Sequence, residues 1–175
     1  MSTVSLTLDE IFDLAKKTLL ANGCDDETAS ILSDLIRNAE QDGSLSHGLF
    51  RLPAYVSGLK SGKINGKGKP EVKKISSSVI KVQGNNCLAP VVLKKGLPEL
   101  AKAAKENGVA VLAINNSHHM AAMWPETEKL AEEGLVAFAC TSYKPAVAPA
   151  GAIKPLFGTN PISFAWPRPG KTPVV

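Results

Sequence analysis

Three short stretches of the chain carry side chains that could do acid–base or binding chemistry. In the first, SLSHGLFR, Ser46 and His47 are adjacent and Arg51 follows four residues after the histidine. An imidazole titrates near neutral pH and can donate a proton, while a guanidinium can bind a carboxylate through two hydrogen bonds. On a helix, residues four apart share a face. The set suits a small carboxylate substrate whose other functional group receives a proton. The same spacing also fits a helix cap at Ser46, a surface histidine at His47 and a solvated charge at Arg51.

The second stretch is NSHHMAAMWPE, residues 116–126, with adjacent histidines at His118 and His119. A metal would need a third ligand at a suitable spacing, and no HExxH pattern is present, so we expect no metal site. The histidines follow an apolar run and precede a helical pattern. Ligands of α/β sheets gather at such strand ends, and small residues such as Ala121 and Ala122 would let a cofactor approach. Helix capping and helix packing explain the same residues equally well.

The third stretch is GTNP, residues 158–161, where Thr159 and Asn160 precede a proline. These side chains could make a preorganised polar contact, although ordinary turn chemistry also accounts for them. The chain contains no GxGxxG fingerprint and no Walker loop, and QGNNCLAP, residues 83–90, is the nearest glycine-bearing loop. A dinucleotide, if bound, is therefore not held by a Rossmann fingerprint.

Helical patterns dominate the first part of the chain. Thr7 and Glu10 have the spacing of a capping box, and two amphipathic helices are predicted to end at Gly23 and Gly43. A third helix is expected from about residue 48 to 58, with Pro53 in its first turns. Residues 1–69 therefore read as a helical subdomain.

The second part, residues 70–175, alternates strands with helices. We expect two short strands within 70–84 and a helix over 88–107. Two strands buried on both faces, 108–115 and 135–142, would flank a helix over 121–134 as a βαβ unit. A proline-rich connector then closes with a strand near 162–166, and the final KTPVV resembles an interrupted strand. The fold class is α/β, a helical subdomain followed by the first part of a mixed-sheet domain.

Composition limits the classes of function. The chain has 175 residues, 44% hydrophobic residues and a net charge of +4, which are typical of a globular domain. No apolar run approaches the roughly 20 residues of a membrane span, and the first residues read as a helix start, so we expect a cytoplasmic protein. Many lysines lie in the glycine-rich KSGKINGKGK without interleaved aromatic residues, so nucleic-acid binding is not expected. The three cysteines form no CxxC pair, which argues against a zinc site or a disulfide framework.

Taken together, SHGLFRLPAYVSGLKSGKIN, NNSHHMAAMWPE and GAIKPLFGTNPI resemble, in order and spacing, the non-Rossmann malate/L-lactate dehydrogenase family of NAD(P)-dependent oxidoreductases. The resemblance covers essentially the whole chain. The form HHMAAMWP is similar to the branch of Δ1-piperideine-2-carboxylate and Δ1-pyrroline-2-carboxylate reductases. The 2-hydroxy-acid enzymes usually have an Asn-His-Phe-Gly type of sequence there, and QGNNCLAP also departs from the glycine-rich stretch of the malate enzymes.

The resemblance implies that residues 1–69 are a substrate or dimerisation subdomain and that residues 70–175 are the first part of an α/β cofactor-binding domain. It also implies roles for particular residues. His47 would be the proton donor, Ser46 its relay partner, and Arg51 and Thr159 the groups that bind substrate. The cofactor would be lined by the stretch that follows the buried strand, namely His119, Met120, Ala121, Ala122 and Met123. In some hydroxy-acid members a histidine of this second stretch is the acid–base group, so the assignment of the proton donor to His47 rather than His119 stays open.

The implied reaction is reduction of a cyclic 2-imino acid to L-proline or L-pipecolate with NADPH or NADH, in a homodimer. Two alternatives remain: a malate/L-lactate type of 2-hydroxy-acid dehydrogenase, and a non-catalytic half-length interaction module. Members of the family are about twice as long as this chain, so we interpret it as the N-terminal half of an enzyme, which need not be active in isolation.

Overall fold

The first two helices begin and end where the sequence predicts. In the computed structural model, which describes residues 4–118 and 121–175, α1 spans Leu8–Ala21 and α2 spans Asp26–Gln41. The Thr7 hydroxyl accepts a hydrogen bond from the Glu10 amide, and the Glu10 carboxylate accepts one from the Thr7 amide. Asp25 caps α2 by accepting from the Thr28 amide at 2.9 Å. The capping box is confirmed, and both helices start at satisfied backbone donors.

The third helix is shorter than the sequence predicts. Two 3₁₀ turns, η1 (Leu45–His47) and η2 (Leu49–Arg51), precede α3 (Leu52–Lys60), and Gly48 separates the two turns. Pro53 lies in the first turn of α3, as expected. The prediction of one helix from residue 48 was wrong because the helical period of the sequence does not distinguish an α-helix from short 3₁₀ turns at its start.

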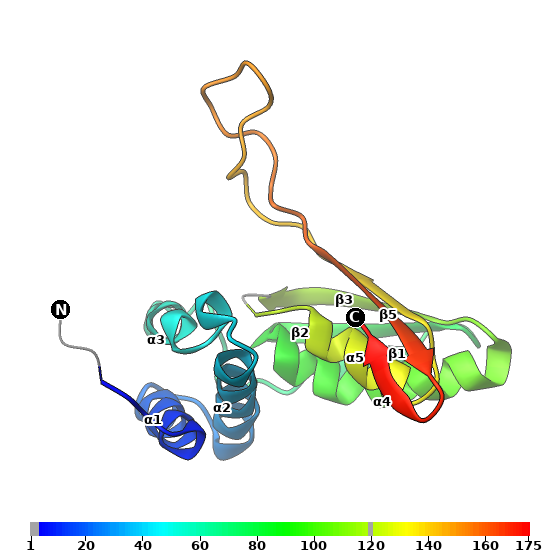
Figure 1. Ribbon diagram of the computed structural model, residues 1–175, viewed down its shortest axis with the longest axis horizontal. Coiled ribbons are helices and arrows are strands. Elements are labelled where there is room, and N and C mark those ends of the chain that lie inside the picture. Colours follow the sequence, from blue (N-terminus) through cyan, green and yellow to red (C-terminus); the bar gives the residue numbers. More distant parts are fainter. Residues whose placement is uncertain (1–3, 119–120) are drawn as a thin grey trace. The chain divides into compact units, whose positions relative to one another are not determined.

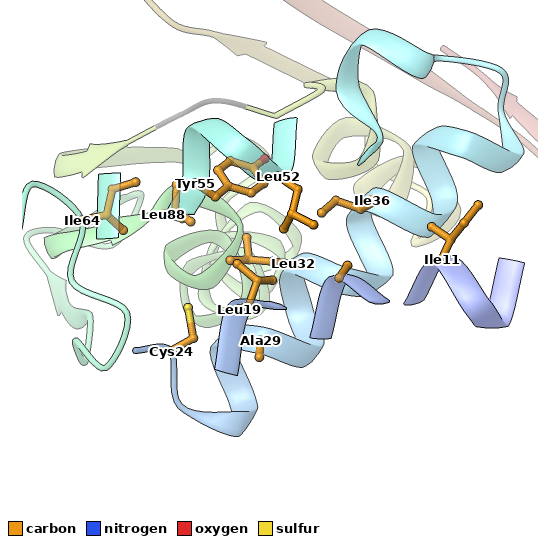
Figure 2. Packing of buried hydrophobic residues seen from close by; sticks show 11 residues of the cluster. Ile11, Leu19, Cys24, Ala29, Leu32, Ile36, Leu52, Tyr55, Ile64 and Leu88 are labelled. Atoms are coloured by element: carbon orange, nitrogen blue, oxygen red, sulfur yellow. The ribbon is translucent and has the colours of Figure 1, made fainter. Parts of the chain in front are cut away.

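The first three helices bury a common apolar core (Figure 2). Leu19 from α1, Leu32 and Ile36 from α2, and Tyr55 from α3 are almost completely buried, and Leu88 joins them. Leu88 stands at the end of a strand outside the helical segment. The core therefore ties the helices to the sheet that follows in sequence.

A three-stranded sheet completes this part of the chain. Its strands are β1 (Glu71–Lys74), β2 (Val79–Leu88) and β3 (Val111–His118), in the order β1-β2-β3, with β2 and β3 parallel and joined through α4 (Ala89–Asn107). Val82 and Cys87 from β2 pack against Val91 and Val92 from α4. The predicted two strands and long helix are confirmed.

Two expectations about the strands are corrected. The strand predicted over 108–115 is β3, but Val111 and Ala113 on it are exposed, so it is not buried on both faces. The parallel βαβ unit is β2–α4–β3, whereas the strand predicted over 135–142 is β4 (Ala137–Cys140), which pairs antiparallel with a later strand. An apolar run indicates a strand, but it does not specify the pairing partner or the covered faces.

The stretch QGNNCLAP forms the irregular end of β2 and the first two residues of α4 instead of a loop. The pairing of β2 with β3 shifts between Gln83 and Cys87. Asn85 and Asn86 in β2 and Asn116 in β3 have positive φ angles of 49°, 60° and 49°, a conformation that asparagine tolerates better than most residues. A Cβ atom at Gly84 would lie 2.7 Å from the Asn116 carbonyl oxygen, so glycine permits the close approach of the two strands.

The last part of the chain forms a second group of elements. Helix α5 (Trp124–Glu132) is followed by β4, β5 (Ile162–Arg168) and β6 (Lys171–Val174), which form an antiparallel sheet in the order β4-β5-β6. Residues 141–161 leave β4 and return to β5 as a long arm, with a bridge between Val147 and Phe157 (Figure 1). The expected proline-rich connector is this arm, and its closing strand is confirmed.

The chain divides into two compact units, Met1–Ala122 and Met123–Val175. The α/β class and the order of a helical segment followed by mixed sheets are as predicted. The proposed boundary between residues 69 and 70 stays a prediction. In the described residues no helix is both long and apolar enough to cross a bilayer.

Candidate active site

The first candidate stretch lies where the chain leaves α2. The helix ends at Gln41, Gly43 adopts a positive φ of 72°, and the Ser44 amide donates to the Ala39 carbonyl at 2.8 Å. This closure of the helix end turns the chain into η1, which carries Ser46 and His47. The position of both residues is therefore set by how α2 ends.

The structure brings Ser46 and His47 into contact. The Ser46 hydroxyl lies 3.0 Å from His47 Nδ1, and the Ser44 hydroxyl lies 3.4 Å from the same nitrogen. Hydroxyl groups can donate to a neutral imidazole and accept from an imidazolium, so this environment suits a ring that gains and loses a proton. Adjacent residues do not automatically face each other, and the 3₁₀ turn is what makes the contact possible. Ser44 is a neighbour of the ring that the sequence analysis did not identify.

Arg51 ends η2 and is half-buried. Its Nε atom is buried and has no hydrogen-bond partner within the described structure. Burial raises the pKa of the nearby Tyr55 hydroxyl to about 12, and the positive charge of Arg51 opposes this effect. A buried N–H donor of a charged group is costly when unpaired.

The expected shared helix face of His47 and Arg51 is not found. The two residues end separate 3₁₀ turns with Gly48 between them, so the four-residue spacing of an α-helix does not describe their relation. Their arrangement depends instead on the backbone at Gly48 and Leu49.

Glu40 contacts this connecting backbone and was missed by the sequence analysis. Its Oε1 atom accepts a hydrogen bond from the Leu49 amide at 2.7 Å. Glu40 lies in the last turn of α2, which has no basic residue in that turn. A carboxylate at a helix C-terminus is unfavourable, and this mismatch was the signal in the sequence that could have identified it.

The second and third candidate stretches have different environments. His119 and Met120 lie outside the described residues. Ala121 is half-buried, Ala122 is buried, and Met123 is a buried residue at the N-cap of α5. Thr159 is exposed on the arm of the second unit. Next to it the Asn160 side chain accepts from the Tyr143 amide at 3.0 Å, so Asn160 has a structural role in the arm.

The fold and the comparisons with known proteins define the class. A helical segment followed by mixed sheets without a Rossmann fingerprint is the architecture of the non-Rossmann dehydrogenases. The family model for malate/L-lactate dehydrogenase matches residues 6–175. The chain belongs to the malate/L-lactate dehydrogenase family, as the sequence resemblance predicted.

The relatives of this chain include both carboxylate reductases and malate dehydrogenases. Over 175 residues the chain is 40% identical to Delta(1)-pyrroline-2-carboxylate reductase 1 from Burkholderia ambifaria. The aligned residues make up 100% of this chain and 52% of that relative. The crystal structure of delta1-piperideine-2-carboxylate reductase from Pseudomonas syringae pv. tomato matches with a TM-score of 0.90 and 40% identity, covering 98% of this chain and 52% of that one.

The structure of malate dehydrogenase from Pyrococcus horikoshii matches with a TM-score of 0.88 and 32% identity, covering 97% of this chain and 49% of that one. The chain therefore spans about half the length of the relatives it matches. Its identity is higher to the two imine reductases than to this malate dehydrogenase.

Proposed function

We propose that the protein to which this chain belongs is an NAD(P)H-dependent reductase of cyclic 2-imino acids. It would convert Δ1-pyrroline-2-carboxylate or Δ1-piperideine-2-carboxylate to L-proline or L-pipecolate. The observation that carries the proposal is the contact of 3.0 Å between Ser46 and His47, in a chain 40% identical to reductases of these substrates. A histidine held by a hydroxyl is a suitable proton donor to a ring nitrogen.

The residues of the first unit have complementary tasks. His47 gives a proton to the ring nitrogen of the substrate while Ser46 holds Nδ1, so the proton leaves from Nε2. Arg51 binds the substrate carboxylate through its guanidinium group. The family resemblance also assigns substrate binding to Thr159, which belongs to the second unit. Fixing the substrate at both ends reduces the entropic cost of reaching the reactive geometry.

The cofactor, NADPH or NADH, is expected to lie along residues His119 to Met123. Ala121 and Ala122 carry no side chain beyond Cβ, and Ala121 is the more accessible of the two, so the backbone at Ala121 leaves room for close approach of a cofactor. Glu126 in the first turn of α5 makes this helix start less suitable for a phosphate. When bound, the reduced nicotinamide supplies the hydride that the imine carbon accepts.

A 2-hydroxy-acid dehydrogenase is the second candidate, because the pairing of Arg51 with a carboxylate applies equally to 2-oxo acids. The similarity to the malate dehydrogenase from Pyrococcus horikoshii favours it. Either proposal includes a cytoplasmic location, which is expected from the sequence, and a homodimer, which the family resemblance implies.

Substitutions in the full-length protein test the roles of the two residues. His47→Ala should lower kcat by about 10²–10⁴-fold, the range for loss of a general acid. Arg51→Lys should raise KM about tenfold, equivalent to one charged hydrogen bond, with a smaller effect on kcat. Arg37→Lys is the matched control, because Arg37 pairs with Asp34 on α2. Unchanged turnover in His47→Ala would contradict the assigned proton donor.

A further inference from the structure

The backbone of Gly48 and Leu49 connects the two 3₁₀ turns that carry His47 and Arg51, and the Glu40 carboxylate is hydrogen-bonded to this connection. Leu49 is the first residue of η2, and no side chain from its own cap residue satisfies the start of this turn. The first amides of a helical turn lack partners within that turn. The Glu40 carboxylate accepts from the Leu49 amide at 2.7 Å from nine residues away.

Because Gly48 has no Cβ atom, the Glu40 carboxylate can reach the Leu49 amide. Gly48 is buried, and a Cβ atom there would overlap Glu40, lying only 2.7 Å from its Cγ atom and closer still to the carboxylate. The three nearest atoms to such a Cβ all belong to the Glu40 side chain. The hydrogen bond between Glu40 and the Leu49 amide therefore depends on glycine at position 48.

The hydrogen bond made by Glu40 can affect both His47 and Arg51, because it lies between them along the chain. The amide that Glu40 binds follows His47 by two residues and precedes Arg51 by two. In addition, the Arg51 amide donates to the Gly48 carbonyl at 3.0 Å, and the His47 amide donates to the Ser44 carbonyl at 2.8 Å. Each turn is thus closed internally, and Glu40 fixes the junction between them to the rigid end of α2.

We infer that Glu40 is a positioning residue, which, together with Gly48, sets the orientation of His47 relative to Arg51. The inference rests on the proposed function, in which these two residues bind opposite ends of one small substrate. A rotation at the junction would move the proton donor away from the ring nitrogen while the carboxylate stays bound. Misplacement by about 1 Å can lower turnover by 10²-fold.

Kinetics of the full-length protein test the inference. Glu40→Ala should lower kcat by about 10–100-fold with a smaller change in KM. Glu40→Gln keeps an oxygen that can accept from the Leu49 amide, so it should restore kcat to within about threefold of the wild-type value. Glu106→Ala is the matched control, since Glu106 is an exposed glutamate in the last turn of α4. Equal kcat in Glu40→Ala and Glu106→Ala would overturn the inference.

A double-mutant cycle separates positioning from a general loss of stability. Gly48→Ala should lower kcat as strongly as Glu40→Ala, because the new methyl group displaces the carboxylate. In the Glu40→Ala background, Gly48→Ala should have a much smaller effect, since the overlapping side chain is gone. Additive effects on kcat would show that the two residues act independently and would contradict the inference.

Hydrogen–deuterium exchange of peptides covering residues 45–52 gives a readout without catalysis. Glu40→Ala should speed exchange of the Leu49 amide by at least about tenfold in the substrate-free protein, which corresponds to loss of one hydrogen bond, whereas Glu106→Ala should not. If the protein reduces no imino acid but the exchange changes as stated, the proposed function fails and the positioning role stands. Unchanged exchange in Glu40→Ala would overturn the role whatever the substrate.

Discussion

At the scale of single residues, the candidate site depends on contacts that side-chain types alone do not specify. The sequence identified Ser46, His47 and Arg51 by their chemistry and by family resemblance. It could not show that Ser46 reaches His47 Nδ1 at 3.0 Å, because adjacent side chains usually diverge and only the 3₁₀ geometry brings these together. Glu40 was missed because its partner is a backbone amide nine residues away, and an acidic residue at the end of a helix indicates such a partner only indirectly.

The Asp25 carboxyl predicts how the stability of the fold depends on pH. Partial burial tends to raise the pKa of its carboxyl, but hydrogen bonds from Lys69 Nζ and Thr28 outweigh burial and lower the pKa from 3.8 to about 2. Because the folded pKa lies below the unfolded one, the stabilisation is complete above pH 3.8 and is lost as the pH falls towards about 2.

Asp25→Asn keeps a capping oxygen but removes the charge. It should lower the free energy of unfolding by about 1 kcal/mol at pH 7, a modest value because the Lys69 side chain is largely exposed and the pair is screened. The difference from wild type should shrink between pH 4 and pH 2. Urea unfolding of the full-length protein at several pH values measures it, with Asp13→Asn on the exposed side of α1 as the control. A difference that does not depend on pH would contradict the assignment.

At the scale of elements, helices were easier to predict than strands and their partners. The capping box at Thr7 and the glycines that end α1 and α2 are local signals, and those helices were located well. The break at Gly48 was missed because it arises from close approach of the Glu40 side chain, which is a tertiary contact. The pairing of β4 with β5 was missed because 21 residues of arm separate the strands, and periodicity carries no information across such a gap.

A buried pair of hydroxyls provides the prediction for the second unit. Thr127 on α5 lies 2.6 Å from the Ser163 hydroxyl on β5, and it also donates to the Trp124 carbonyl at 3.1 Å. Both groups are satisfied when Ser163 donates to Thr127. This contact fixes α5 onto the β4–β5 pair, where the inward side chains are small, such as Ala137 and Ala165.

Ser163→Ala should lower the free energy of unfolding by about 0.5–1.5 kcal/mol, the net value of one hydrogen bond. Thr127→Val should cost more, about 1–3 kcal/mol, because it leaves the buried Ser163 hydroxyl without its acceptor. In the double variant the cost should be smaller than the sum, since no donor is left unpaired. Denaturant unfolding of the full-length protein measures all three, and simple additivity would show that the hydroxyls are not coupled.

At the scale of the whole molecule, the family and the α/β class could be predicted from motifs in the right order along the entire chain. The residues proposed to act on the substrate, Ser46, His47 and Arg51, lie in the first unit, while Met123 and Thr159 lie in the second. The chain spans about half the length of its relatives. The choice between imine and oxo acid rests on the local sequence HHMAAMWP and on identity to the reductases.

The most direct test of the central claim is the initial rate of NADPH and NADH oxidation by the full-length protein with four substrates side by side. These are Δ1-pyrroline-2-carboxylate, Δ1-piperideine-2-carboxylate, oxaloacetate and pyruvate. Our account predicts that kcat/KM for at least one of the imino acids exceeds that for either oxo acid by more than about 100-fold, or roughly 3 kcal/mol of discrimination in the transition state. A preference for oxaloacetate or pyruvate would contradict the assignment as an imine reductase, while leaving the family unchanged.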